Sequence, residues 1–291
     1  MNAWKRFYER VPILGDLMMI RRATVKAAHE AELSRTMMAC YLTERLIAED
    51  QRSNPDKRLL RKAHQCCSQN GEDGMIGEIL NRVGTSNCSF LEIGVGNGME
   101  NNTAYLLALG WTGFWIDGST EFLKAADFWN HQSPGCVKAR QSFVTKANVS
   151  DVVANMGVPI EIDLLSVDID QNTYYIWESL AHLRPRVAVI EYNANITPET
   201  EWKVSYSDSR CWDGSLNFGA SLKALEMLGE RLGYALVGCN ITGVNAFFVR
   251  NDLVGDHFEP PFTAENHFEP PRYSLGFRGG HRLNLLDRIN T

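Results

Sequence analysis

Residues 90–103 carry side chains whose types and spacing could do chemistry, and they read FLEIGVGNGMENNT. An apolar run holds one acid, Glu92, and then breaks at Gly94, Gly96 and Gly98. Glycine accepts positive φ and lets a ligand approach the backbone, so the pattern favours a strand that turns sharply into a helix beside a bound nucleoside. Tight turns that bind no ligand are the alternative.

The glycine spacing is G-x-G-x-G, and Met99 occupies the place of the third glycine in the dinucleotide fingerprint. This spacing favours S-adenosylmethionine (SAM) over NAD, because the ammonium and ribose groups of SAM suit acidic partners. We assign Glu92 to the methionine ammonium. A second acid, Asp117, ends the run WTGFWID one strand–helix–strand unit later. A carboxylate at that place can accept both ribose hydroxyls.

Two amides, Asn101 and Asn102, stand at the start of the helix expected after the glycines. They could cap that helix or contact the methionine carboxylate. The complete set of predicted cofactor-binding residues is Glu92, Gly94, Gly96, Gly98, Asn102, Asp117, Gly118, Ser119 and Asp168.

Oxygen-bearing side chains also follow two later apolar runs, with Asp168 and Asp170 after one and Glu191 and Asn193 at the end of the next. Ligands of an open parallel sheet sit beyond the carboxyl ends of its strands, so we expect these four to lie together. As hard oxygen donors they suit Mg²⁺ or another divalent cation. Binding the hydroxyls of an acceptor, or capping helices, is the alternative.

Methyl transfer to a hydroxyl requires alignment and removal of the hydroxyl proton, by a general base or with the help of a metal ion. We therefore take Asp168, Asp170 and His64 as the candidate catalytic residues. His257 and His267, in the repeated phrase HFEPP, are further histidines to test. The HFEPP loops could cover the site or simply wrap the domain.

Strands and helices must alternate to position these groups. The expected strands lie near 88–93, 112–117, 136–140, 162–168 and 186–191, and the helices between them near 99–109, 119–128, 148–156 and 173–182. This alternation predicts parallel strands with right-handed crossovers. A helix over 218–232 then leads to two adjacent strands, YALVGC and VNAFFVR, joined by a hairpin turn. A terminal hairpin on a parallel sheet is typical of SAM-dependent methyltransferases.

Two further segments have more than one interpretation. Residues 16–50 repeat apolar residues at helical spacing and could form a dimer surface, a membrane-surface helix or a packing helix. The stretch from Trp202 to Trp212 is long, polar and aromatic, which suits a loop that stacks on a sugar or another ring, although an ordinary connection is equally consistent.

Composition narrows the classes of function. The chain of 291 residues has a net charge of −6 and no long basic run, which argues against nucleic acid as its main partner. Seven scattered cysteines show neither C-x-x-C nor zinc spacing and indicate reduced thiols. With no signal-peptide core and no apolar run of membrane-spanning length, we expect a cytoplasmic protein without a transmembrane segment.

The motifs SQNGEDG, FLEIGVGNGMENNT, FWIDGS, LLSVDIDQNTYY, VIEYNA and GVNAFFVR together resemble the FkbM-like SAM-dependent methyltransferases over roughly residues 64–275. The resemblance implies SAM binding and methylation of a hydroxyl, often on a sugar or secondary metabolite. The family's usual D-x-E-G is replaced here by residues 168–171, DIDQ. No acid follows the third strand, where many methyltransferases bind the adenine amine, and Gln141 or Ser142 could substitute.

These observations predict a Rossmann-like class I methyltransferase of the α/β class, with a mostly parallel seven-stranded sheet and a terminal antiparallel hairpin. Residues 1–63 would form an N-terminal helical extension that could carry a homodimer contact, and residues 64–291 the SAM-dependent domain with a C-terminal tail. We expect a small-molecule or saccharide acceptor. The alternatives are a catalytically inactive binding protein with this fold and an NAD-dependent oxidoreductase.

Overall fold

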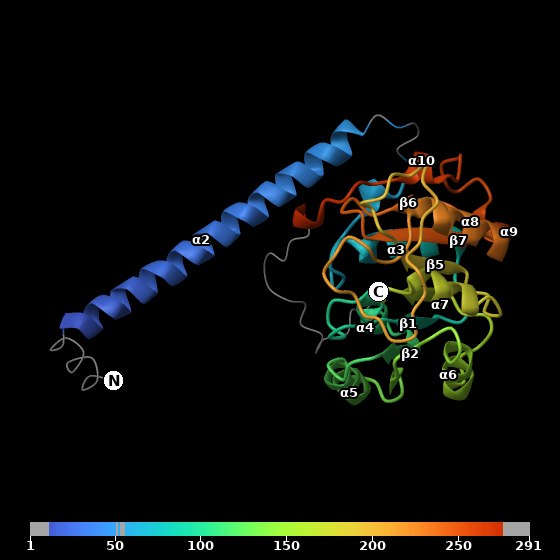
Figure 1. Ribbon diagram of the computed structural model, residues 1–291, viewed down its shortest axis with the longest axis horizontal. Helices are drawn as coiled ribbons and strands as arrows, with labels where there is room; N and C mark the ends of the chain where they lie inside the picture. The colour runs from blue at the N-terminus through green and yellow to red at the C-terminus, as the bar shows by residue number, and fades with distance from the viewer. Residues whose placement is uncertain (1–11, 51, 53–55, 276–291) are drawn as a thin grey trace.

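A seven-stranded sheet with the strand order β3-β2-β1-β4-β5-β7-β6 lies at the centre of the computed structural model, which describes residues 12–50, 52 and 56–275 (Figure 1). Residues 276–291 of the predicted tail lie outside the described residues. The strands are β1 (Ser89–Ile93), β2 (Thr112–Asp117), β3 (Val137–Gln141), β4 (Leu164–Val167), β5 (Val187–Glu191), β6 (Tyr234–Cys239) and β7 (Asn245–Arg250).

One strand of this sheet, β7, runs opposite to the other six. β1 to β5 pair in parallel, whereas β7 runs antiparallel to both β5 and β6. The order turns around at β1, which lies between β2 and β4, so the carboxyl ends of these three strands meet at the crevice where ligands of such sheets bind. The predicted fold class, an α/β fold with a mostly parallel, Rossmann-like seven-stranded sheet and a terminal antiparallel hairpin, is confirmed.

Helices cover both faces of the sheet. On one face lie α3 (Glu72–Val83), α4 (Ala104–Ala108) and α5 (Leu123–Gln132), and on the other α6 (Val149–Met156), α7 (Thr173–Ser179) and α8 (Leu222–Leu232). Within β1, Phe90 packs into the first layer while Leu91 and Ile93 pack into the second, as the period of two along a strand requires. Strands buried on both faces explain the continuous apolar runs in the sequence.

Two predicted helices begin later than expected. The helix expected over 99–109 is reduced to α4, and the one expected over 119–128 is α5, beginning at Leu123. Residues 101–103 cannot join α4 because their amide and hydroxyl groups hydrogen-bond to the buried Glu92. Ser119 is held in a turn because its backbone N–H donates to Asp117. Hydrogen bonds to Glu92 and Asp117 therefore keep these residues out of the helices that their sequence spacing predicts.

The N-terminal helix α2 (Pro12–Glu49) confirms the predicted helical extension and projects away from the sheet domain (Figure 1). The chain then enters the domain before residue 63, because Leu59 packs in the core against Gly238 of β6. The remaining short helices are η1 (Leu60–Lys62), α9 (Asn251–Val254), α10 (Ala264–His267) and η2 (Tyr273–Leu275). Among the described residues, no helix has the length and apolar character needed to span a membrane.

Candidate functional site

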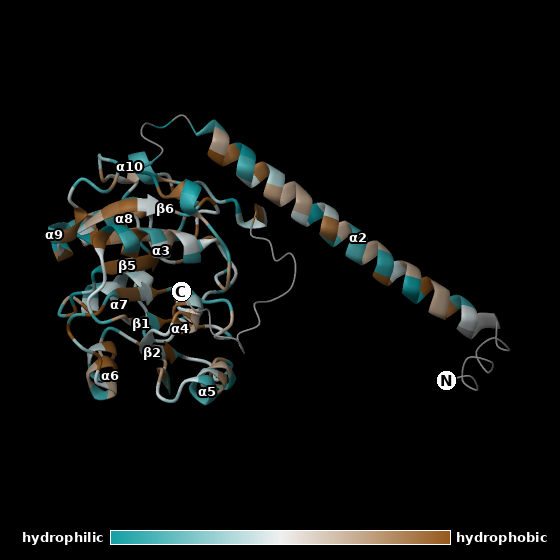
Figure 2. Cartoon of the chain, turned by 180° about the vertical axis from the view of Figure 1, so that it is seen from behind, coloured by the Kyte–Doolittle hydropathy of each residue, from teal (hydrophilic) through white to brown (hydrophobic). Residues whose placement is uncertain are grey.

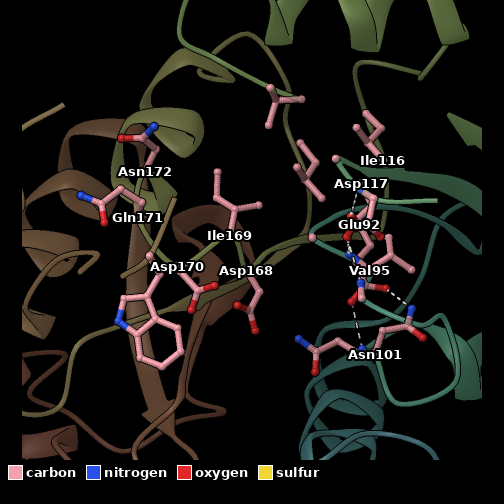
Figure 3. Close-up of a pocket in the computed structure, with 18 of the residues that line it drawn as sticks. Glu92, Val95, Asn101, Ile116, Asp117, Asp168, Ile169, Asp170, Gln171 and Asn172 are labelled. Carbon is pink, nitrogen blue, oxygen red and sulfur yellow. Dashed lines mark hydrogen bonds between the residues drawn. The ribbon is translucent and has the colours of Figure 1, made fainter. Parts of the chain in front are cut away.

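A pocket of about 680 Å³ opens at the carboxyl ends of β1, β2 and β4. Figure 3 shows two of its walls, one formed by the segment Asp168–Asn172 and the other by Glu92, Asn101 and Asp117. The position agrees with the crevice expected at the reversal of strand order. All nine predicted cofactor-binding residues except Gly98 line this pocket.

The three glycines after β1 have different roles. All three have positive φ, at 88°, 64° and 72° for Gly94, Gly96 and Gly98. A Cβ at Gly94 would lie 1.6 Å from the carbonyl oxygen of Asp168, and one at Gly98 would lie 2.7 Å from the Cβ of Ala125. A Cβ at Gly96 would meet nothing within 4 Å. Gly94 and Gly98 therefore serve internal packing, and only Gly96 offers open space to a ligand.

This difference gives a first prediction. Gly94→Ala should lower the free energy of unfolding by about 3 kcal/mol or more, because it combines left-handed strain with a backbone clash between β1 and β4. Gly96→Ala, which carries only the strain, should cost about 1 kcal/mol. Urea unfolding of both variants measures the difference, and equal losses would contradict the packing role of Gly94.

Asp117 accepts hydrogen bonds from the backbone of the glycine loop. Its Oδ2 accepts hydrogen bonds from the backbone N–H groups of Val95 and Gly96 at 2.8 and 2.9 Å. Its Oδ1 accepts from the N–H of Ser119 at 2.7 Å. The carboxylate also lines the pocket, and a carboxylate has about four acceptor positions, so it can receive ligand hydroxyls in addition.

Glu92 fixes the loop at residues 101–103 through hydrogen bonds. Its carboxylate accepts from the side chains of Asn101 and Thr103 and from the backbone N–H of Asn102. Burial raises the pKa of Glu92 to about 7, although these hydrogen bonds act in the opposite direction. The two oxygens that we assigned to a methionine ammonium are thus occupied within the chain. That assignment remains a prediction, whereas the role of Glu92 in shaping the loop is shown.

The two amides do not cap α4. Thr103 is the N-cap residue and makes no side-chain capping bond, so the capping interpretation of Asn101 and Asn102 is wrong. Asn102 donates instead to the hydroxyl of Ser166 on β4 at 3.0 Å. Asn101 lines the pocket, and its Oδ1 is buried without a hydrogen-bond partner. It is therefore available to a donor group on a ligand.

Three carboxyl groups gather at the ends of β4 and β5. Asp168 and Glu191 are hydrogen-bonded to each other, and Glu191 also accepts from the backbone N–H of Asp170 at 2.9 Å. Burial, reinforced by repulsion from Asp170, raises the pKa of Asp168 to about 7. Burial likewise raises the pKa of Glu191 well above its usual value. Burial and the repulsion between these neighbouring carboxyls thus favour their protonated forms.

The predicted four-residue cation site is not assembled. Asn193 is fully buried, and its amide donates to the carbonyls of Leu216 and Phe218 while its oxygen accepts from Asn195. The amide and the oxygen of its side chain are therefore hydrogen-bonded to neighbouring loops and do not face the carboxyl groups. In the described part of the chain, no group of three His, Cys, Asp or Glu side chains is arranged to hold a metal ion. The described residues around the pocket therefore do not fit a metal ion.

None of the histidines selected from the sequence lines the pocket. The side chain of His64 is exposed, and its backbone only fixes the turn before α3 through bonds with Gly71 and Gly74. The prediction of His64 as a catalytic base is therefore not supported by its position. His267 is buried, and burial lowers its pKa to about 3, so it stays neutral. The HFEPP segments wrap the domain, because Phe258 and Glu269 are buried in it away from the pocket.

Sequence reasoning missed a polar wall on the α3 side of the pocket. Glu72, from the SQNGEDG motif, accepts from the side-chain amides of Asn240 and Asn245 and so ties α3 to the β6–β7 hairpin. Its neighbour Asp73 accepts three backbone N–H groups of residues 66–68. The motif therefore folds Gln69 and the segment around it against the pocket.

Unpartnered buried polar atoms concentrate at this pocket. Four of the eight such atoms found among the described residues belong to residues that line it, namely Asn101 Oδ1, Gln171 Nε2, Asn172 Oδ1 and Asn245 Oδ1. Buried polar groups normally have partners, so their clustering indicates a site built for a polar ligand.

Two aromatic side chains complete the lining. Phe143, directly after β3, is 47 % exposed, and Trp212 in the predicted stacking loop is 49 % exposed. Ser142 also lines the pocket, whereas Gln141 donates to the carbonyl of Gly118 and does not. Phe143 could have been found from the sequence as an aromatic residue that follows a predicted strand end.

Comparisons with known proteins find only distant likenesses in fold. No family model matches it, and no curated protein matches it. The solved structure of WbdD matches with 15 % identity and a TM-score of 0.41, over 75 % of this chain and 49 % of WbdD. WbdD is described as a bifunctional kinase-methyltransferase. The chain thus spans about half the length of that protein.

Two further solved structures are SAM-dependent methyltransferases. One from Clostridium acetobutylicum matches with 12 % identity and a TM-score of 0.37, over 60 % of this chain and 89 % of that one. Another from Geobacter sulfurreducens, in complex with S-adenosyl-L-homocysteine, matches with 19 % identity and a TM-score of 0.36, over 62 % and 70 %. Likenesses this distant carry no activity to the chain. The FkbM-like resemblance stays a prediction from the motifs.

Proposed function

We propose that the chain binds SAM at the glycine loop and transfers its methyl group to a hydroxyl of a polar acceptor such as a sugar or secondary metabolite. One observation carries the proposal. The open face of Gly96, the carboxylate of Asp117 and the carboxyl group of Asp168 all line a single pocket. Nucleoside recognition and a base for a hydroxyl are thus close enough to serve one reaction.

The cofactor fits the part of the pocket between β1 and β3. Gly96 leaves room for a nucleoside, Asp117 presents a carboxylate at the strand end, and Phe143 presents an aromatic surface after β3. The buried Oδ1 of Asn101 still needs a donor, which an ammonium group would supply. Bound SAM supplies an electrophilic methyl group.

The acceptor fits the part of the pocket beside β4. Asp168 there accepts the proton of the hydroxyl, and its hydrogen-bonded partner Glu191 holds its carboxyl group in position. Gln171 and Asn172 offer one donor and one acceptor atom without partners, and Trp212 offers a flat apolar surface. Unpartnered amides beside an exposed indole suit an acceptor with several hydroxyls.

Asp117→Ala should weaken SAM binding by about 1–3 kcal/mol through the loss of charge-assisted hydrogen bonds. The protein should stay folded, because Asp117 contributes loop hydrogen bonds and no core packing. Calorimetric titration measures the change. Glu121→Ala is the matched control, since Glu121 is an exposed acid four residues away that does not line the pocket. An unchanged dissociation constant for Asp117→Ala would remove Asp117 from the site.

Two titrations and one assay separate the proposal from its alternatives. SAM should bind and NAD should not, whereas the reverse would indicate an oxidoreductase. Transfer of a radiolabelled methyl group from SAM to a panel of hydroxylated acceptors should give labelled product. SAM binding without transfer to any acceptor would favour a binding protein that keeps the fold without catalysis.

A further inference from the structure

The helix α2 exposes an unusual amount of apolar surface. Of the fifteen large hydrophobic side chains that are exposed among the described residues, ten lie on α2. Every residue from 16 to 35 of this helix is exposed. Figure 2 shows apolar bands along the whole length of the projecting helix. A monomer seldom leaves such a surface uncovered, so α2 requires a partner.

An uninterrupted uncharged seam follows one side of α2. Its positions alternate in steps of three and four residues, which is the spacing of the inward-facing positions of a coiled coil. The seam residues are Leu17, Ile20, Thr24, Ala27, Ala31, Ser34, Met38 and Tyr41. Eight such positions span more than three heptads without a charge, and large side chains at both ends flank small ones in the middle. Strict seven-residue spacing of this kind predicts left-handed pairing with another helix.

The sheet domain does not cover this seam. The buried or half-buried positions of α2 include Ala39, Thr43, Leu46 and Ile47, which lie on a different side of the helix, and α2 contacts η2. The seam residues Met38 and Tyr41 stay 57 % and 53 % exposed beside them. The domain therefore anchors the C-terminal end of α2 through one side and leaves the seam open.

The residues that flank the seam specify the orientation of a partner helix. In a parallel, in-register pair they bring Asp16 opposite Arg21 of the other copy, and Glu30 opposite Arg35. In an antiparallel pair along the same seam, Arg21 would lie opposite Arg35, and Glu30 opposite Glu30. Like charges at those places are unfavourable, so the charges favour the parallel arrangement.

We propose that two copies of this chain associate through α2 as a parallel, in-register coiled coil with residues 17–41 at the seam. Four of the ten exposed apolar side chains lie in the seam, and burying them in both copies, together with the smaller seam residues between them, removes on the order of 1,000 Å² from water, the lower bound of a specific interface. The pairing holds the two pockets on one assembly without contributing a residue to either. It is independent of the proposed methyl transfer.

Sedimentation equilibrium of the full chain tests the pairing, with the mass of a dimer as the expected result. Ile20→Glu with Ala27→Glu should shift the mass to a single chain, because both residues lie in the seam. Met19→Glu with Val25→Glu is the matched control outside the seam, with Met19 and Ile20 exposed to 64 % and 62 %. Circular dichroism and thermal unfolding report that each variant is folded. A single-chain mass for the wild type overturns the proposal, and binding of that monomer to anionic vesicles would identify a lipid surface as the occupant instead.

Three variants test the orientation. Ala27→Cys should form a disulfide between copies under mild oxidation, because a parallel in-register pair places residue 27 opposite itself. Glu30→Arg should weaken the dimer by placing like charges opposite each other, and adding Arg35→Glu should restore it by reversing the pair. A dimer that gives no cross-link at residue 27 and ignores the charge reversal overturns the parallel arrangement.

Discussion

Gly96→Val should abolish SAM binding while leaving the domain folded. The backbone at Gly96 has φ of 64°, which a β-branched residue strongly disfavours, and the space beside its Cα opens into the pocket. A valine side chain there would occupy the volume that a nucleoside needs. Calorimetric titration should therefore show no saturable heat with SAM at concentrations that saturate the wild type.

Backbone strain alone must be separated from lost space. Gly135→Val supplies this control, because Gly135 has φ of 77°, nothing within 4 Å of its Cβ position, and no place in the pocket. It should lose stability to a similar extent and still bind SAM. If folded Gly96→Val bound SAM normally, the glycine loop would be only a structural turn.

Asp168→Asn should lower turnover by about 10²–10⁴-fold, the usual effect of losing a general base. The amide keeps the shape of the side chain and can donate to Glu191, but it cannot accept a proton from the acceptor. SAM affinity should change little, because Gly96 and Asp117 remain in place. A chelator should leave wild-type turnover unchanged, since the acidic side chains in the described part of the chain are not arranged around a common metal position.

The pH dependence of the acceptor kcat/KM identifies the base. Because the pKa of Asp168 is raised to about 7, the wild-type rate should fall as pH drops through that value and the carboxylate takes up a proton. Asp168→Asn should lack this limb. Asp170→Asn should keep it but move it to lower pH, because the charge of Asp170 helps to raise the pKa of Asp168. A limb that persists in Asp168→Asn assigns the base elsewhere.

The strand ends were predictable because the sequence patterns that mark them lie within a few neighbouring residues. Buried strands give continuous apolar runs, and the polar residue that ends each run, such as Asp117 or Asp168, must lie at the same edge of a parallel sheet. The antiparallel hairpin was also predictable, from two adjacent apolar runs and the turn between them. These features depend on residues close together in the sequence.

The partners of each strand-end side chain were not predictable in this way. The side-chain amide of Asn193 donates hydrogen bonds to two carbonyls in the loop at 216–218 and does not line the pocket. The carboxylate of Glu92 accepts hydrogen bonds from residues 101–103. Whether an oxygen faces a ligand or a neighbouring loop depends on tertiary contacts that spacing does not encode. The same reason explains why His64, although it precedes a motif, stays outside the pocket.

A crystal structure of the full chain with S-adenosyl-L-homocysteine tests the central claim most directly. The account predicts density for the nucleoside against Gly96, with its ribose hydroxyls on Asp117 and its sulfur facing the side of the pocket that holds Asp168. Density for the ligand at another place, or a pocket that stays without ligand at saturating concentration, would contradict it.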